Sequence, residues 1–272
     1  MGNLTTTEEY FRRRGTVAEW WRPEGLPQGL ALHFQAQLDF LISQFIWQGK
    51  NVLDAGGGNG RIAFLISTLG AQVYGLDISE EMIEEAQKGA TGVGAAVHLT
   101  LGDIKRLPFS DDVFDCTICI ETLMHLNNPR RALRELARVT KPGGVLIVGV
   151  DNSISIVALV QGLQAPQRWL YQRLVLKEVI PKTHWTHTPL TVKSWFLESG
   201  VNLHRVFGIG LFHPEAILYL WPRVWIRLIP YAFAGWFLTR VEERYRLGCG
   251  PLKNLMKALI YVGVKPAGAG RS

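Results

Sequence analysis

Cysteine and long hydrophobic runs are both scarce in this sequence, and each shortage narrows what the protein can be. The 272 residues contain three cysteines, at Cys116, Cys119 and Cys249. So few cannot form a disulfide framework, and this scarcity is typical of a reducing compartment. The best candidate for a membrane span, residues 216–239, is interrupted by two arginines and two prolines. Because a spanning helix needs roughly 20 apolar residues, we expect this segment not to cross a membrane.

Two further absences concern targeting and metal binding. Residues 1–10 contain no apolar core, so we expect no secretory signal and a cytoplasmic location. No set of His, Cys, Asp and Glu has the spacing of metal ligands, so we expect no metal. Cys116 and Cys119 form a C-x-x-C within an apolar run that suits a strand, where residues three apart point to opposite faces. A metal or redox role for this pair is therefore disfavoured.

Charge is unevenly distributed along the chain. Residues 1–159 carry 14 Lys and Arg against 18 Asp and Glu, whereas residues 160–265 carry 14 against 5. Most of the nine tryptophans also lie in the basic half. A basic, aromatic surface suits an anionic lipid, a nucleic acid or an acidic substrate. An ordinary solvated basic face is the alternative for any single cluster.

The stretch around which the chain is organised is NVLDAGGGNGRIAF, residues 51–64. Its first five residues suit a short buried strand, and from Gly60 the apolar residues follow helical spacing. A glycine turn between a strand and a helix lets a polar ligand approach the backbone N–H groups closely. Arg61 occupies the third glycine position of a G-x-G-x-x-G dinucleotide motif, and no Gly-Lys pair of a phosphate-binding loop follows.

What remains, D-x-G-x-G-x-G from Asp54 to Gly60, resembles motif I of the class I S-adenosylmethionine (SAM) dependent methyltransferases. A glycine turn with only a packing role is the alternative. Asp77 ends the second expected strand, where a carboxylate can accept hydrogen bonds from both hydroxyls of a ribose. Asp103 and Ile104 follow the third strand. The resemblance implies that the Asp103 carboxylate takes the adenine amino group and that the Ile104 N–H meets a ring nitrogen.

The expected cofactor site has nine members, all close to the ends of expected strands. They are Asp54, Gly56, Gly58, Gly60, Asp77, Ile78, Asp103, Ile104 and Glu121. Glu121 follows the fourth strand, and three roles stay open for it: holding the methionine end of SAM, capping the turn, or acting as a base.

Strands alternate with helices over residues 49–151, which predicts a parallel sheet with right-handed crossovers and a ligand at the carboxyl ends of the strands. With the resemblance, this order predicts an α/β, Rossmann-like class I methyltransferase fold with a seven-stranded, mostly parallel sheet and helices on both faces. A helix is expected from Ser79 to about Lys88. The seven strands are expected at 51–55, 71–77, 97–101, 113–120 and 144–151, within 188–210, and at 257–266.

Five parts of the chain follow from this interpretation. They are an N-terminal helical cap or lid (1–48), the SAM-binding core (49–151), a part with substrate-side helices, the last core helix and the sixth strand (152–210), an aromatic and basic helical insertion (211–256), and the last strand with the tail (257–272).

The LPF-x-D-x-x-FD pattern of residues 107–115 strongly resembles the subgroup of quinone-biosynthesis C-methyltransferases and many natural-product and lipid methyltransferases. The resemblance implies SAM as co-substrate and a small, apolar or lipid-like acceptor. The alternatives are a nucleic-acid or protein methyltransferase that uses the basic half, and a SAM-binding protein without methyl transfer. Nucleic acid is disfavoured because ETLM, residues 121–124, replaces the [ND]-P-P-[YFW] motif of enzymes that methylate exocyclic amines or glutamine.

Methyl transfer from a sulfonium is an in-line displacement, for which the protein supplies proximity, orientation and a dry pocket. A hydroxyl or acidic carbon acceptor also needs a base, and histidine is the usual one. The candidates are His125, after the fourth strand, and His184 and His187, before the last core helix. His98 and His204 fall within expected strands, where we expect them to pack.

Residues 211–256 mix Trp, Tyr and Phe with arginine. Such a mixture suits a helix at a membrane interface or a helical lid over an apolar acceptor, and an extra buried layer is the alternative. We therefore expect a cytoplasmic protein that can associate peripherally with the inner membrane face. The sequence makes no prediction of the oligomeric state.

Overall fold

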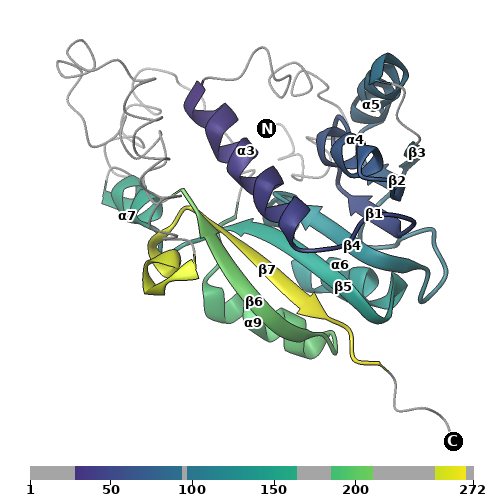
Figure 1. The fold of residues 1–272 in the computed structure, drawn as a ribbon. Coiled ribbons are helices and arrows are strands. Elements are labelled where there is room, and N and C mark those ends of the chain that lie inside the picture. The colour runs from purple at the N-terminus through teal and green to yellow at the C-terminus, as the bar shows by residue number, and fades with distance from the viewer. Residues whose placement is uncertain (1–27, 94–96, 164–184, 211–248, 268–272) are drawn as a thin grey trace, which may run out of the picture.

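The computed structural model describes residues 28–93, 97–163, 185–210 and 249–267 (Figure 1). A seven-stranded sheet forms its centre, in the order β3-β2-β1-β4-β5-β7-β6. The strands are β1 (Asn51–Ala55), β2 (Gln72–Asp77), β3 (Val97–Leu101), β4 (Phe114–Ile120), β5 (Thr140–Asp151), β6 (Asn202–Ile209) and β7 (Ala258–Val264). β7 runs antiparallel to both of its neighbours, and the other pairs are parallel. The predicted Rossmann-like, mostly parallel sheet is therefore confirmed.

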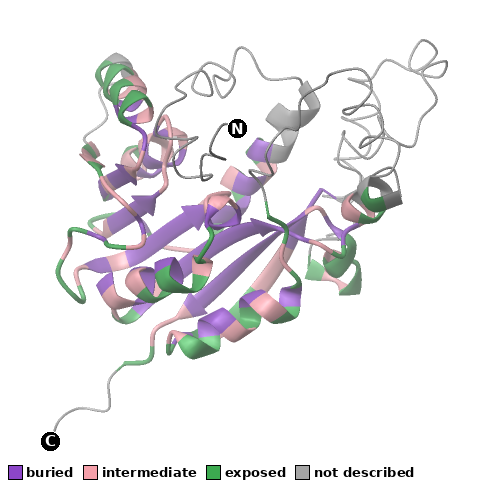
Figure 2. Ribbon diagram, turned by 180° about the vertical axis from the view of Figure 1, so that it is seen from behind, coloured by how far each residue is buried: buried purple, intermediate pink, exposed green. Residues whose placement is uncertain are grey.

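Helices cover both faces of this sheet, because the strands carry apolar side chains on both faces and each face must be buried. The helices are α3 (Gln28–Ser43), α4 (Arg61–Thr68), α5 (Glu80–Val93), α6 (Pro129–Val139), α7 (Ile156–Leu163) and α9 (Pro189–Glu198), with short 3₁₀ turns η2 (Leu123–His125) and η6 (Pro251–Leu255). One buried cluster joins the sheet to α6 and α9, and a second joins its other face to α3 and α4 (Figure 2). Burying each large apolar side chain contributes roughly 1.5–3 kcal/mol.

The two cysteines of β4, which are three residues apart, show that side chains of one strand are buried on opposite faces of the sheet. Cys116 belongs to the cluster with α3 and α4, and Cys119 belongs to the cluster with α6 and α9. Both are fully buried, and burial raises the pKa of each thiol well above its ordinary value. They are packing residues on opposite faces, as the spacing predicts.

Three local predictions are wrong. Helix α5 continues past Lys88 to Val93. It passes through Gly89, which has no side chain to meet the Phe64 ring of α4, since a Cβ there would lie 2.7 Å from that ring. β5 begins at Thr140, which pairs with Phe114 before a register shift. His204 of β6, which was expected to pack, is exposed because β6 is an edge strand of the sheet. His98 of the other edge strand, β3, is also exposed, but its ring stacks on Tyr74 at 4.8 Å, as predicted.

The expected peripheral parts are described only in part. Of the cap 1–48, the structure describes α3 and the turn after it, and residues 1–27 lie outside the described residues. The insertion does fall between β6 and β7, but residues 211–248 also lie outside the described residues. Its described end forms η6.

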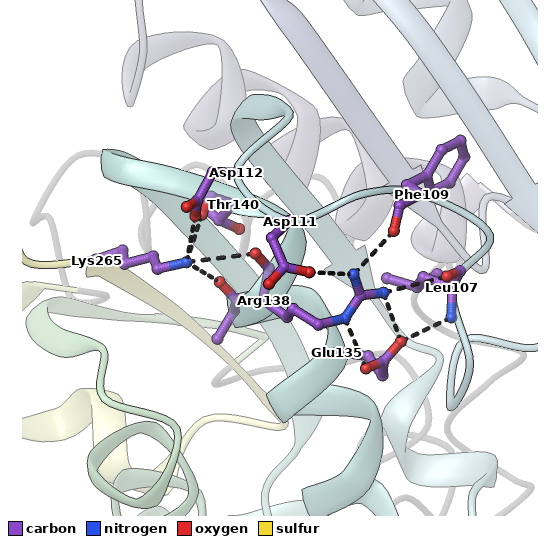
Figure 3. A network of polar contacts seen from close by, with 9 residues as sticks. Leu107, Phe109, Asp111, Asp112, Glu135, Arg138, Thr140 and Lys265 are labelled. Atoms are coloured by element: carbon purple, nitrogen blue, oxygen red, sulfur yellow. Dashed lines mark hydrogen bonds and ion pairs between the residues drawn. The ribbon is translucent and has the colours of Figure 1, made fainter.

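The LPF-x-D-x-x-FD segment is fastened to the sheet by two cations (Figure 3). The Arg138 guanidinium donates to the carbonyls of Phe109 (2.8 Å) and Leu107 (3.1 Å) and pairs with the Asp111 carboxylate (2.7 Å). Glu135 accepts from both Arg138 (2.8 Å) and the Leu107 N–H (2.9 Å). At the other end, Lys265 Nζ donates to Asp112 (2.7 Å) and to three carbonyls at the end of α6 and the start of β5. Much of this family pattern therefore serves the scaffold.

Replacing Arg138 with alanine is expected to lower the free energy of unfolding by about 2–3 kcal/mol, because two carbonyls and two carboxylates lose a charged donor. Thermal unfolding should show a Tm lower by roughly 5–10 °C for a chain of this size. Arg134→Ala is the matched control, since Arg134 lies on the same helix and makes only a 3.7 Å ion pair with Glu198. Equal Tm shifts in the two variants would contradict this role for Arg138.

Candidate functional site

The glycine loop lies at the carboxyl end of β1 and leads into α4. Gly56, Gly58 and Gly60 have positive φ angles of 75°, 55° and 83°, which glycine adopts without strain. A Cβ at Gly56 would overlap the Thr122 side chain, whereas a Cβ at Gly58 would meet nothing closer than Met82 Sδ at 3.9 Å. The backbone at Gly58 is therefore open to a ligand, while Gly56 is required by close packing.

The Asp77 carboxylate, at the end of β2, is held against this loop. Its Oδ2 accepts from the Gly58 N–H and its Oδ1 accepts from the Ser79 N–H, both at 2.9 Å. Burial raises the pKa of Asp77, and these two N–H groups lower it. The Ile78 N–H also interacts with this carboxylate and lowers its pKa. Because the two oxygens together can accept about four hydrogen bonds, one acceptor position remains for a ligand. Asp77 can thus hold the loop and a ligand hydroxyl together.

The end of β3 lies beside the end of β2, since Asp77 pairs with Leu101 in the parallel ladder. Asp103 follows two residues later, and its Oδ1 accepts from the Lys105 N–H at 2.9 Å. Ile104 is buried, whereas Ile78, next to Asp77, is half-buried. The structure therefore brings Asp77 and Asp103, predicted to bind ribose and adenine, close together at the carboxyl ends of β2 and β3.

Asp54 lies under the glycine loop with 1% of its surface exposed. A Cβ at Gly57 would lie 2.8 Å from its Oδ2, so this glycine leaves room for the carboxyl. Within the described residues, Oδ2 has no hydrogen-bond partner. Burial raises the pKa of Asp54 to about 7, although the Ala63 N–H and the Arg61 charge act in the opposite direction. Asp54 is thus a buried acid that titrates near neutral pH.

This titration gives a prediction for the protein without SAM. Because the folded-state pKa of about 7 exceeds the ordinary 3.8, the folded state binds more protons between about pH 4 and 7. Its stability should therefore fall as the pH rises through that window, by at most about 4 kcal/mol, and level off above it. Asp54→Asn should remove this part of the slope in urea unfolding at pH 5 and pH 8. Asp39→Asn, an exposed change on α3, should leave it intact, and an unchanged slope in Asp54→Asn would contradict the assignment.

A partly buried polar cluster, of which the sequence predicted only Glu121 as a site residue, connects the loop to α3. The Arg61 guanidinium lies 3.8 Å over the Phe34 ring, and the Gln37 amide donates to Glu121 Oε1 at 2.6 Å. Burial lowers the pKa of Arg61, while the Glu121 and Asp54 carboxylates raise it. Arg61 Nη1 is buried and has no hydrogen-bond partner in the described part of the chain. A polar group with this property next to a ligand loop is available to an anionic ligand group.

Glu121 is one of two non-glycine residues with positive φ in the described chain, at 58°. A side chain there costs free energy that the surrounding structure must supply, and such residues gather at functional sites. Arg61 was visible in the sequence as the residue that breaks the dinucleotide motif. Gln37 was not, because its contact with Glu121 spans 84 positions and depends on how α3 packs.

The chemistry of these residues fits SAM. An open backbone at Gly58 adjoins two carboxylates suited to ribose and adenine, and a guanidinium N–H and a carboxylate, on Arg61 and Glu121, suit the two charges of an amino acid. In the described ranges, no group of three or more His, Cys, Asp or Glu could hold a metal ion. Over the same ranges, no helix has the length and apolarity to cross a membrane.

The described histidine candidates come from segments that touch. His125 ends η2 and is half-buried. The Trp185 N–H donates to the carbonyl of Met124, beside His125, at 2.8 Å. Two residues on, His187 forms an isolated parallel bridge with Asn152, the residue after β5, and its ring packs edge-on against Trp195 at 4.7 Å. His184 lies outside the described residues.

Comparison with known proteins gives matches over most of the chain. Residues 53–148 match the family described as a methyltransferase domain. The ubiquinone biosynthesis O-methyltransferase of Coxiella burnetii (strain Dugway 5J108-111) is 32% identical over 212 residues, which cover 76% of this chain and 86% of that relative. With the same-named protein of strain RSA 331 / Henzerling II, the match is 32% identical and covers 53% of this chain and 62% of the relative.

Among solved structures, the magnesium protoporphyrin IX methyltransferase of Synechocystis PCC 6803 with bound SAH superposes with a TM-score of 0.64. The match covers 95% of this chain and 97% of that one, at 18% identity. At this identity the likeness concerns the fold alone.

Proposed function

The chain belongs to the class I SAM-dependent methyltransferases, and from this membership we propose that it methylates a hydroxyl oxygen on a small, lipid-like acceptor such as a quinone intermediate. The observation that carries the proposal is the 32% identity to a ubiquinone biosynthesis O-methyltransferase over 86% of that relative's length. A nucleic-acid or protein acceptor, or SAM binding without transfer, is not favoured by such relatives.

The residues of the site have distinct roles in this methyl transfer. Bound SAM supplies an activated methyl group. Asp77 and Asp103 hold its ribose and adenine, and the Gly58 backbone leaves space for close approach. Arg61 and Glu121 take the carboxylate and ammonium of its amino-acid end.

The acceptor oxygen attacks the methyl carbon as the bond from that carbon to the sulfonium sulfur breaks with its electron pair left on sulfur, and the oxygen must lose its proton. The His125 imidazole accepts that proton, because His125 follows the carboxyl end of β4, on the side of the sheet where the cofactor residues lie. His187, from the adjoining segment, and His184 are the other candidates for this role.

Methyl-labelled SAM tests the proposal directly. The full-length protein is incubated with a phenol that carries an apolar tail, with the same compound already O-methylated, and with RNA and a protein mixture. Label is expected only in the free phenol, and mass spectrometry should place it on oxygen. Label in the O-methylated compound, in RNA or in protein, or in none of them, would overturn the proposed acceptor class.

We also propose that the enzyme is cytoplasmic and docks on the inner membrane face through residues 211–256. Their aromatic and arginine side chains support this, since each arginine near an anionic surface contributes about 1 kcal/mol that salt weakens. Co-flotation with anionic and neutral liposomes, at low and high salt, should show binding that salt reduces and does not abolish. Recovery in the soluble fraction under all four conditions would contradict docking.

A further inference from the structure

An open pocket of about 230 Å³ lies between α9, the edge strand β6 and η6. Four of its lining residues carry nitrogen groups that can bind an anion, and we call it the basic pocket. They are Lys193 of α9, His204 and Arg205 of β6, and Lys253 of η6. In Figure 1, β6 and α9 lie at the opposite edge of the sheet from β3. The basic pocket is therefore separate from the glycine loop.

The cations of the basic pocket have no carboxylate partner among the described residues. Residues 185–210 and 249–267 contain five Lys and Arg, and their one acidic residue is Glu198. Glu198 lies 3.7 Å from both Arg130 and Arg134 of α6, which engage its charge. Arg205 contacts Gln44 Oε1 at 3.3 Å. Cations gathered around one space repel each other unless an anion enters it, so the arrangement favours a bound anion.

Exposed apolar residues are next in sequence to residues that line the basic pocket. Leu252 and Leu255 flank the lining pair Lys253–Asn254 on η6 and are 42% and 37% exposed, and Leu190, which follows the lining residue Pro189, is 77% exposed. A surface that combines exposed leucines with lysine and arginine, and has no acidic residue, matches the surfaces that bind anionic membranes. The leucines are an observation independent of the charges.

The wall of the basic pocket is joined to the carboxyl end of β5. The buried side chain of Asn152, which follows β5, donates to the carbonyl of Asn254 at 2.7 Å. Asn152 also pairs with His187. An anion in the basic pocket would therefore sit next to the segment that carries a candidate base.

We propose that the basic pocket binds a phosphate group, and that the headgroup of an anionic phospholipid supplies it. This site is additional to SAM binding and methyl transfer, and it does not depend on the identity of the acceptor. A lipid phosphate held here would keep the β5 end of the sheet at the membrane surface, where lipid-like molecules gather. Binding through residues 211–256 alone would not involve Lys193 of α9, so Lys193 separates the basic pocket from docking by that segment.

The test measures binding of the full-length protein to vesicles of phosphatidylglycerol and of phosphatidylcholine. Lys193→Gln and Lys253→Gln should each weaken binding to phosphatidylglycerol about fivefold, with little change for phosphatidylcholine. Lys88→Gln is the matched control, because Lys88 is 71% exposed and lies on α5, towards the other edge of the sheet. Methyl transfer to a soluble acceptor should be unchanged in all three variants and confirms that they fold.

Inorganic phosphate distinguishes the two sources of the group. Its binding is followed through the NMR signals of the His204 ring in wild type and in the two pocket variants. If the variants weaken binding of phosphatidylglycerol and of inorganic phosphate, both parts of the proposal hold. If they weaken only the binding of inorganic phosphate, the phosphate site holds and the lipid source is wrong. If neither changes, or if Lys88→Gln weakens vesicle binding equally, the proposal is overturned.

Discussion

His125→Ala is expected to lower kcat for a hydroxyl acceptor by about 10²–10⁴-fold, while the affinity for SAM stays close to that of the wild type. The reason is that a general base acts only when the acceptor oxygen loses its proton. His125 is the last residue of η2, which follows β4, and it is half-buried. Single-turnover rates with labelled SAM measure the loss, and calorimetry measures SAM binding in the same variant.

A structural role for His125 predicts a different pattern. A packing residue would lower stability, and its loss would affect all acceptors alike. A base matters less as the acceptor becomes more acidic, so a phenol with an electron-withdrawing substituent should suffer a smaller loss than an unsubstituted one. His98→Ala is the matched control, because His98 is an exposed histidine on β3 that stacks on Tyr74 at 4.8 Å. Wild-type turnover in His125→Ala would show that His125 is not the base, and His184 and His187 would be the remaining candidates for it.

The order and spacing of the chain were enough to predict the sheet and one edge of the site. Glycine turns and acidic residues at strand ends are local signals, and the parallel topology carries them to a single place. Asp77 and Asp103 therefore appear where the sequence predicts them. The Gly58 N–H donates to the Asp77 carboxylate, so the glycine loop and this acidic residue lie side by side, as a shared ligand site requires.

What could not be predicted depends on contacts between distant parts of the chain. The Gln37–Glu121 hydrogen bond and the Arg61–Phe34 contact exist because α3 packs over the loop, and no local pattern records this. The exposure of His98 and His204 follows from strand order, which places β3 and β6 at the edges. The scaffold role of Asp111 likewise depends on Arg138, 27 positions away. The family pattern was visible, but the part of it that serves the site and the part that serves the fold were not separable.

Asp77→Ala is expected to weaken SAM binding by 1.5–3 kcal/mol, or roughly 10–150-fold, because a charged acceptor is lost from the ribose site. The same carboxylate also holds the N–H groups of Gly58 and Ser79. Part of the loss could therefore come from a displaced loop rather than from lost ribose contacts. Calorimetry of the folded variant with SAM gives the total effect.

A thermodynamic cycle separates the two contributions. Adenosine and 2′,3′-dideoxyadenosine, which lacks both ribose hydroxyls, are titrated against wild type and Asp77→Ala. If Asp77 binds the hydroxyls, removing them should cost much less affinity in the variant than in the wild type, since the interaction is already absent. If the loop is the cause, the two losses should add. Ser79→Ala, which removes only the 3.4 Å contact from the Met82 N–H, should leave SAM affinity nearly unchanged. Unchanged SAM affinity in a folded Asp77→Ala protein would show that Asp77 serves the loop and does not bind the ribose.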